Sequence, residues 1–258
     1  MANSITGQLT RGSRRYNLPR LPSAATAGGD IGNIVANNLV LYLNAGDSNS
    51  YNGSGTTWYD LSTGSHDCVL VNGPVFNTGN GGYFDFDGVY DYGYVLNHTD
   101  FYFGTGEFTI EVWAMTEDIS ETYQILLGNH NAGVGGGWYF YGDYSDSMAF
   151  GYASQADDAT FTQSQDTWYH FAVRRDANGI DFFRNNSAGS ANLTFTDDIL
   201  DPNNLDLIIG NLYYYNTVGS SDIFGWNGRI AQVRVYSRAL SNAELTQNYD
   251  AHRSLYGL

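Results

Sequence analysis

The stretch GEFTIEVWAM at residues 106–115 decides the fold class. Phe108, Ile110 and Val112 occupy alternate positions, with polar or amphipathic residues between them. Because the side chains of a β-strand point alternately to its two faces, this pattern predicts a strand with one face in a core. A second stretch, TWYHFAVRRD at 167–176, alternates in the same way and adds Phe171 and Val173 to the predicted core.

Similar short stretches separated by turn residues recur along the chain, as expected of an antiparallel sandwich. The DANG turn at 176–179 favours a hairpin, and Ser241 with Glu244 forms the capping box of the one predicted helix, 241–252. We predict an all-β, two-sheet antiparallel sandwich with one short C-terminal helix. The other predicted strands are 37–46, 68–73, 81–97, 123–129, 137–144, 147–153, 179–186, 205–211 and 228–240.

Composition fits one large domain. Of the 258 residues, 42% are hydrophobic and 16% aromatic. The net charge of −16 argues against nucleic acid as a partner, because phosphates would be repelled. The chain has no lysine, which excludes a P-loop lysine and Schiff-base chemistry. Cys68 is the one cysteine, so no intrachain disulfide can form, and we interpret it as a small core residue.

Charge divides the chain into an extended basic arm, 1–30, and a domain, 31–258. The arm holds four of the eleven Lys/Arg residues and one of the 27 acids, so it carries +3 and the remainder −19. Pro19 and Pro22 oppose a helix there. Arginine binds carboxylates in a bidentate way, so the arm is predicted to dock on an acidic partner. Its predicted partner-binding residues are Arg11, Arg14, Arg15 and Arg20.

Four groups of motifs together resemble a known family. They are LVLYLNAGDSNSYNGSGTTWYDLS (39–62), YFDFDGVYDYGYV (83–95) with FTIEVWA (108–114), TWYHFAVRRDANGIDFFRNN (167–186), and IIGN (208–211) with FGWNGRIAQVRVYSRALSNAEL (224–245). In this order they are similar to the laminin-G-like branch of the concanavalin A-like lectin/glucanase jelly rolls. The resemblance implies a jelly-roll sandwich, and the opening motif resembles domains of phage and bacterial surface proteins.

The glucanases of this superfamily carry E-x-D-x-E or E-x-D-x-x-E on one strand face, so that two carboxylates flank the glycosidic bond. Glu107 and Glu111 share a face here, but Thr109 replaces the central Asp, and Glu117 stands beside Asp118. We therefore predict that the protein is not an enzyme. A divergent glycoside hydrolase using Glu107, Glu111 or Glu117 is the less favoured alternative.

The five histidines, at positions 66, 98, 130, 170 and 252, follow no familiar metal-binding spacing, and we interpret His170 as structural.

The lectins of this superfamily suggest glycan binding, which needs an aromatic face for stacking. Alternation places Tyr139 with Tyr141 on one face and Tyr213 with Tyr215 on another. The alternative is that these rings cover the sheet, since Tyr favours strands.

Calcium is the one candidate cofactor, and no other is predicted. Acidic loops offer Asp197, Asp198 and Asp201 as weak candidate ligands, and Asp85, Asp87 and Asp91 as a second group. The competing interpretation is that acidic loops are merely solvated. We expect Asp60 and Asp91 to bond to loop backbone.

Two functional hypotheses remain open. The first is a non-enzymatic, virion-associated structural protein, a capsid decoration or a fibre or tail appendage, whose arm docks on a capsid or tail protein of the same particle. The second is a carbohydrate-binding adhesion module, with calcium as a candidate requirement. We also expect a homo-oligomer, which rests on analogy. Residues 1–30 lack the apolar region of a secretion signal and no apolar run is long enough to span a membrane, so we expect synthesis in the host cytoplasm and no membrane insertion.

Overall fold

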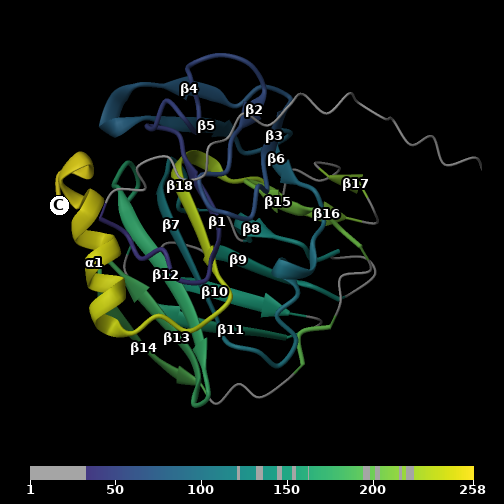
Figure 1. Cartoon of the computed structure of the whole chain (residues 1–258), viewed down its shortest axis with the longest axis vertical. Coiled ribbons are helices and arrows are strands. Elements are labelled where there is room, and N and C mark those ends of the chain that lie inside the picture. Colours follow the sequence, from purple (N-terminus) through teal and green to yellow (C-terminus); the bar gives the residue numbers. More distant parts are fainter. Residues whose placement is uncertain are drawn as a thin grey trace, which may run out of the picture.

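Two antiparallel sheets packed face to face form the domain, with one helix against the outer side of one sheet (Figure 1). The computed structural model describes residues 33–120, 123–131, 136–143, 147–152, 155–161, 163–193, 198–200, 204–214, 217–218 and 224–258. The predicted all-β jelly-roll sandwich is confirmed. The arm, 1–30, lies outside the described residues.

The first sheet has the strand order β14-β13-β12-β7-β18-β5-β4, and β1 also pairs with β18. The stretch 108–115 lies in β7, which pairs with β12 and β18 near the middle of this sheet. The strands are β1 (Leu39–Asn44), β4 (Val75–Asn77), β5 (Tyr83–Asp87), β7 (Phe108–Thr116), β12 (Tyr169–Asp176), β13 (Gly179–Arg184), β14 (Ser187–Leu193) and β18 (Asn227–Tyr236).

The second sheet has the order β11-β10-β9-β8-β15-β6-β3-β2, and a two-stranded ribbon of β16 and β17 is separate from both sheets. Its strands are β2 (Thr57–Trp58), β3 (Cys68–Val71), β6 (Tyr92–Val95), β8 (Gln124–Gly128), β9 (Trp138–Asp143), β10 (Ser147–Tyr152), β11 (Gln155–Thr160) and β15 (Leu207–Ile209). The ribbon is β16 (Tyr213–Tyr214) and β17 (Thr217–Val218), and the short 3₁₀ turns are η1 (Gly79–Gly81), η2 (Thr99–Phe101) and η3 (Arg253–Tyr256).

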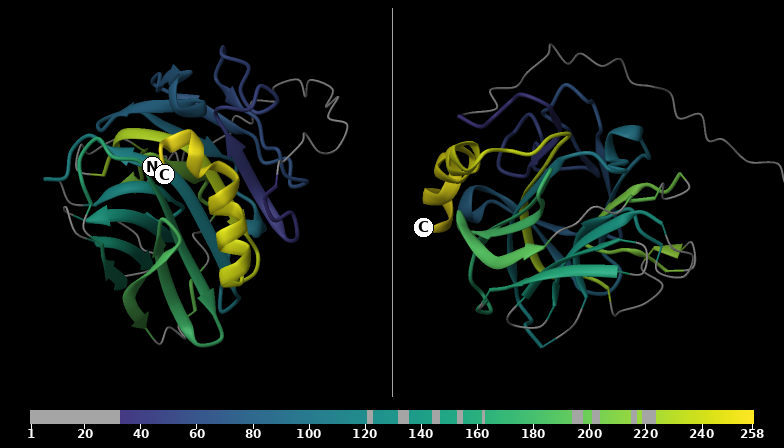
Figure 2. Two further views of the ribbon diagram at one scale, coloured as in Figure 1. Left: turned by 90° about the vertical axis from the view of Figure 1, so that its left-hand side faces the viewer. Right: turned by 90° about the horizontal axis from the view of Figure 1, so that it is seen from below.

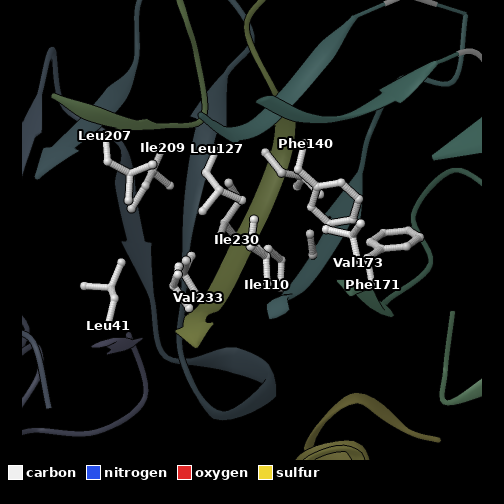
Figure 3. Close-up of a cluster of buried hydrophobic side chains, with 14 of the residues drawn as sticks. Leu41, Ile110, Leu127, Phe140, Phe171, Val173, Leu207, Ile209, Ile230 and Val233 are labelled. Atoms are coloured by element: carbon white, nitrogen blue, oxygen red, sulfur yellow. The ribbon is translucent and has the colours of Figure 1, made fainter. Parts of the chain in front are cut away.

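The main core lies between the inner faces of the two sheets. Figure 3 shows Ile110, Phe171 and Val173 of the first sheet opposite Leu127 and Phe140 of the second. The predicted core residues are confirmed as buried: Phe108, Ile110, Val112, Phe171 and Val173 are each at most 1% exposed. Every second side chain of β7 therefore enters the sandwich, as the alternation in its sequence predicts.

Cys68 is a free, buried cysteine in β3. A Cβ added to Gly93 of the neighbouring strand would lie 2.5 Å from its Sγ, so the thiol fills the space that glycine leaves. Burial raises the pKa of the Cys68 thiol, and the nearby Asp67 raises it further. This agrees with a small core residue rather than a nucleophile.

The predicted helix is α1 (Asn242–His252), which lies along the outer face of the first sheet (Figure 2). Its capping box is confirmed: the Ser241 hydroxyl accepts from the Glu244 amide, and the Glu244 carboxylate accepts from the Ser241 amide. Leu245 packs beside Tyr42 and Tyr236 in a second apolar cluster. The strands thus bury both faces of the first sheet, one in the sandwich and one under α1.

Buried charges meet beneath this helix. Glu111 of β7, Arg234 of β18 and His170 of β12 are each at most 1% exposed. The Glu111 carboxylate lies 3.2 Å from His170 Nε2 and 3.6 Å from Arg234 Nη1. Asn248 of α1 donates to Glu111 Oε2 at 2.6 Å, which ties the helix to the sheet. We call Glu111, His170, Arg234 and Asn248 the buried polar cluster.

The cluster keeps the Glu111 carboxylate ionised although it is buried. Burial raises the pKa of Glu111, but the hydrogen bond and charge of His170, together with the charge of Arg234 and the Asn248 amide, outweigh it, so the net shift is downward. The interpretation of His170 as a structural residue is consistent with this position.

We predict that Glu111→Ala destabilises the domain strongly. Removing Glu111 leaves the Arg234 guanidinium buried without its counter-charge, which costs about 3–5 kcal/mol. Urea denaturation measures the change. The matched control is Glu117→Ala, because Glu117 is one-third exposed and its pair with Arg229 is worth at most about 1 kcal/mol. Equal losses in both variants would contradict the role given to the cluster.

We also predict that His252 links stability to pH. Burial and the Arg234 guanidinium lower the pKa of His252 to about 3, and Arg234 Nη2 lies 3.0 Å from its Nδ1. The unfolded chain takes up a proton below about pH 6.5 while the folded chain does not, so this contribution to stability is lost as pH falls toward 3.

By pH 5 the loss is about 2 kcal/mol relative to pH 7. The variant His252→Asn lacks this titration, so the stability gap between wild type and variant narrows by about that amount over the same range. Urea denaturation at the two pH values measures the gap. A gap independent of pH would show that His252 titrates normally in the folded chain.

Candidate functional site

Tyrosines of β9 form a stacked pair on the outer face of the second sheet. Trp138 and Phe140 point into the core, each 0% exposed, and Tyr139 and Tyr141 therefore lie on the opposite face. The two tyrosine rings are 5.1 Å apart with an interplanar angle of 29°. The predicted shared face is thus present. Tyr141 is buried, however, at 4% exposure, and Tyr139 is half-buried.

The stack continues beyond β9 on both sides. Tyr123 stacks on Tyr141 at 5.3 Å and 21°, and His130 packs against Tyr139 at 4.9 Å. Phe224 meets Tyr123 edge-on at 6.4 Å. We call His130, Tyr139, Tyr141 and Tyr123 the aromatic row. It joins residues just outside the two ends of β8 to the middle of β9, an arrangement that strand alternation alone does not reveal.

Tyr123 is the exposed end of this row, with 42% of its surface accessible. It also has a φ of 57°, in the left-handed region that a bulky side chain rarely adopts. Such a conformation costs on the order of 1–3 kcal/mol and persists only where its surroundings enforce it. The stack on Tyr141 holds the ring in place, and the result is an accessible aromatic surface at a strained position.

The other end of the row has a defined protonation state. His130 Nδ1 lies 2.5 Å from the Gly136 carbonyl, which can only accept, so Nδ1 carries the proton. Burial lowers the pKa of His130, although the hydrogen bond to Gly136 opposes this shift. The imidazole is therefore neutral at pH 7.

Tyr139 lies flat over the neighbouring strand β10. A Cβ added to Gly151 would come 2.1 Å from Tyr139 Cζ, so the ring occupies the space over the glycine. Burial raises the pKa of the Tyr139 hydroxyl, with a smaller contribution from Tyr123. This ring covers the sheet, as the alternative interpretation expected, and it also supports the exposed end of the row.

The remaining predicted site residues are only partly placed. Tyr213 lies in β16 opposite Val218 of β17, and Tyr215 lies outside the described residues. Asp198 is exposed beside Gly104. Also outside the described residues are Asp197, Asp201, Arg11, Arg14, Arg15 and Arg20.

In the second acidic group, Asp87 and Asp91 bind the backbone of a turn. Asp87 Oδ1 accepts from the backbone amides of Val89, Tyr90 and Asp91 at 2.8–3.0 Å, and Asp91 Oδ2 accepts from the Asp87 amide. Burial and the charge of Asp87 raise the pKa of Asp91 to about 6. The predicted backbone bonding of Asp91 is therefore confirmed.

Asp60 holds a second loop in the same way. Its carboxylate accepts from the amides of Tyr42, Ser62 and His66 at 2.8, 2.8 and 2.9 Å, respectively. The prediction that Asp60 bonds to loop backbone is confirmed.

The three glutamates of the hydrolase alternative are separately engaged. Glu111 is sealed in the buried polar cluster, and Glu117 pairs with Arg229 at 2.7 Å. Glu107 Oε2 accepts weakly from the Ala239 amide at 3.4 Å. Glu111 cannot flank a substrate, because no part of its carboxylate reaches the surface.

Among the described residues, no helix is long and apolar enough to span a membrane.

Solved structures of similar fold are mostly larger proteins. The binding domain of Paraclostridial Mosquitocidal Protein 1 matches with a TM-score of 0.63 and 14% identity, covering 85% of this chain and 55% of that one. The Botulinum neurotoxin serotype G binding domain matches with a TM-score of 0.62 and 12% identity, covering 82% of this chain and 50% of that one. Trypanosoma rangeli sialidase in complex with the inhibitor DANA matches with a TM-score of 0.57 and 14% identity, covering 82% of this chain and 32% of that one. The chain thus spans from a third to just over half of these structures.

No curated protein matches the sequence. The family model Laminin_G_3, described as the Concanavalin A-like lectin/glucanases superfamily, matches residues 86–246. This segment is well over half of the chain. It contains β7, both sheets' central strands and the start of α1. The chain belongs to the laminin-G-like family of the concanavalin A-like lectin/glucanase superfamily.

Proposed function

We propose that this chain is a non-catalytic, lectin-like binding domain that holds glycans on the aromatic row of its second sheet. The observation that carries the proposal is Tyr123, an exposed ring in a strained conformation, stacked on Tyr141. The C–H face of a sugar packs on such a ring, and the amphipathic tyrosine offers a hydroxyl to the sugar at its edge. The buried members of the row make the platform rigid.

Family and fold support a binding role. Two of the similar structures are the binding domains of a mosquitocidal protein and of a neurotoxin, and the third is a sialidase in complex with an inhibitor. Their low identity supports the fold alone, so the glycan assignment rests on the aromatic row.

Absence of catalysis is part of the same proposal. A retaining glycosidase needs two carboxyl groups about 5 Å apart that flank the bond, and an inverting one needs a wider pair. The burial of Glu111 and the ion pair of Glu117 support the non-enzymatic assignment.

We predict that Tyr123→Gly weakens glycan retention and leaves the fold intact. Glycine adopts a φ of 57° without strain, so relief of strain offsets the lost stacking and the stability change stays within about 1 kcal/mol. Loss of the ring weakens binding about fivefold or more, the equivalent of about 1 kcal/mol of stacking. A glycan array, run with calcium and with chelator, measures retention, and urea denaturation measures stability.

Tyr59→Ala is the matched control, because Tyr59 is 46% exposed and lies outside the row. It should bind as wild type does. If Tyr123→Gly and the double variant Tyr139→Ala/Tyr141→Ala both retain glycans as wild type does, the aromatic row is not the glycan-binding surface. Hydrolysis of any arrayed polysaccharide by the wild-type protein would overturn the non-enzymatic part.

A second function is favoured by the charge distribution along the sequence. The first 30 residues carry +3 against −19 for the remainder. We propose that this arm anchors the domain to a capsid or tail protein of a phage particle, with the sandwich displayed outward in several copies. Display of many copies would multiply weak glycan binding through avidity.

We predict that deletion of residues 1–30 abolishes incorporation into particles. Glycan retention by the deleted protein should equal that of the full chain, because the aromatic row lies in the domain. Co-sedimentation with particles measures incorporation. Normal incorporation of the deleted protein would contradict the anchoring role without affecting the glycan proposal.

A further inference from the structure

Two histidines and an aspartate meet at one edge of the second sheet. His66 Nε2 lies 2.9 Å from Asp100 Oδ2, and His98 Nδ1 lies 3.2 Å from the same oxygen. One candidate ligand atom from each residue lies within 4.8 Å of the other two. We call His66, His98 and Asp100 the histidine cluster. It belongs neither to the aromatic row nor to the buried polar cluster.

Strand register brings these residues together. β3 and β6 are antiparallel, and Cys68 at the start of β3 pairs with Val95 at the end of β6. His66 lies two residues before Cys68, and His98 lies three residues after Val95, so both stand at the same end of the strand pair. Figure 1 shows β3 and β6 side by side.

Local contacts orient the ligand atoms. The His66 amide donates to Asp60, and the His66 ring packs on Phe101 at 5.1 Å. A Cβ added to Gly64 would lie 2.6 Å from His66 Cδ2, so the loop closes tightly on the ring. His98 caps η2, with its Nδ1 3.2 Å from the Asp100 amide. The His66 ring is thus held by Gly64 and Phe101, whereas His98 and Asp100 orient each other.

His98 Nδ1 faces two groups of Asp100. A ring nitrogen has one in-plane site, which holds a proton, accepts a hydrogen bond or binds a metal ion. Nδ1 lies 3.2 Å from the Asp100 amide nitrogen and 3.2 Å from Asp100 Oδ2. A metal ion on Nδ1 would take the place of the amide hydrogen bond and would lie beside the carboxylate.

The donor set selects the kind of cation. Two imidazole nitrogens and one carboxylate oxygen are ligands that zinc prefers, at about 2.0–2.2 Å, with a fourth position left for water. Ligand atoms of a tetrahedral site at such distances are about 3.3 Å apart, close to the 2.9 and 3.2 Å seen here. Calcium is disfavoured, because it takes six to eight oxygen ligands.

Exposure indicates how the ion would enter. The His66 side chain is 9% exposed, whereas Asp100 is 36% and His98 is 49% exposed. The buried imidazole forms the floor of the cluster, and the other two ligands reach solvent. An open fourth position would therefore face outward.

We propose that His66, His98 and Asp100 bind one zinc ion, through His66 Nε2, His98 Nδ1 and the Asp100 carboxylate. The site lies at the rim of the second sheet. Zinc then cross-links the loop before β3 to η2. The proposal is independent of glycan binding on the aromatic row.

Titration calorimetry with zinc chloride tests the site, using full-length protein first treated with chelator. We expect a stoichiometry of one, a higher melting temperature in zinc, and a tetrahedral visible spectrum when cobalt is substituted. His98→Ala removes an exposed ligand and should weaken binding by more than about tenfold. Asp100→Asn should also weaken it. Calcium chloride should produce no comparable heat.

Asp250→Asn is the matched control, because Asp250 is an exposed carboxylate on α1, far in sequence from the cluster. It should bind zinc as wild type does. His66→Ala also removes the ring that packs on Phe101, so His98→Ala and Asp100→Asn decide the question. No binding at stoichiometric zinc, or binding unchanged in both variants, would overturn the proposal.

Discussion

The buried polar cluster on the outer face of the first sheet is the constraint that makes the two sheets of the domain different: the first must be covered by a helix, and the second need not be. Three adjacent strands, β12, β7 and β18, each point an ionisable side chain away from the core. Charges without water must be paired and covered, or the strands cannot form. The side-chain amide of Asn248 in α1 donates to Glu111 and to Tyr236, and its Oδ1 accepts from the Val35 backbone amide. The helix is therefore required by the charges beneath it as well as by its apolar contacts.

This requirement decides which sheet is available for binding. α1 closes the first sheet, and the carboxylate that sequence comparison with glucanases brings forward, Glu111, becomes a structural group. On the second sheet the described residues present tyrosines instead of buried charges, and no described helix covers them. Both proposed sites belong to this sheet, since the aromatic row lies on β9 and at the ends of β8, and β3 and β6 lead to the histidine cluster.

The sequence predicts what depends on local pattern. Alternation along β7 identifies its inner residues, and the Ser241–Glu244 pair identifies the start of α1. β11 and β14 escape prediction because QADDAT and SAGSANL show no apolar alternation, and they become strands by pairing at the sheet edges. The histidine cluster escapes because it depends on the register between β3 and β6, and Tyr123 escapes because its stacking partner lies across a strand.

Strained backbone conformations occur beside the two proposed sites, the aromatic row and the histidine cluster. Among the described residues, non-glycine positions with positive φ are mostly Asn or Asp, which tolerate that conformation; the other two are Ser65 and Tyr123. Tyr123 is the exposed end of the aromatic row, and Ser65 directly precedes His66 of the histidine cluster. Elsewhere the chain uses residues suited to each turn. An unfavourable backbone persists when the surrounding structure enforces it, and such positions cluster at binding sites. The two exceptions thus support, independently of ring stacking or ligand geometry, the view that the second sheet carries the working surface.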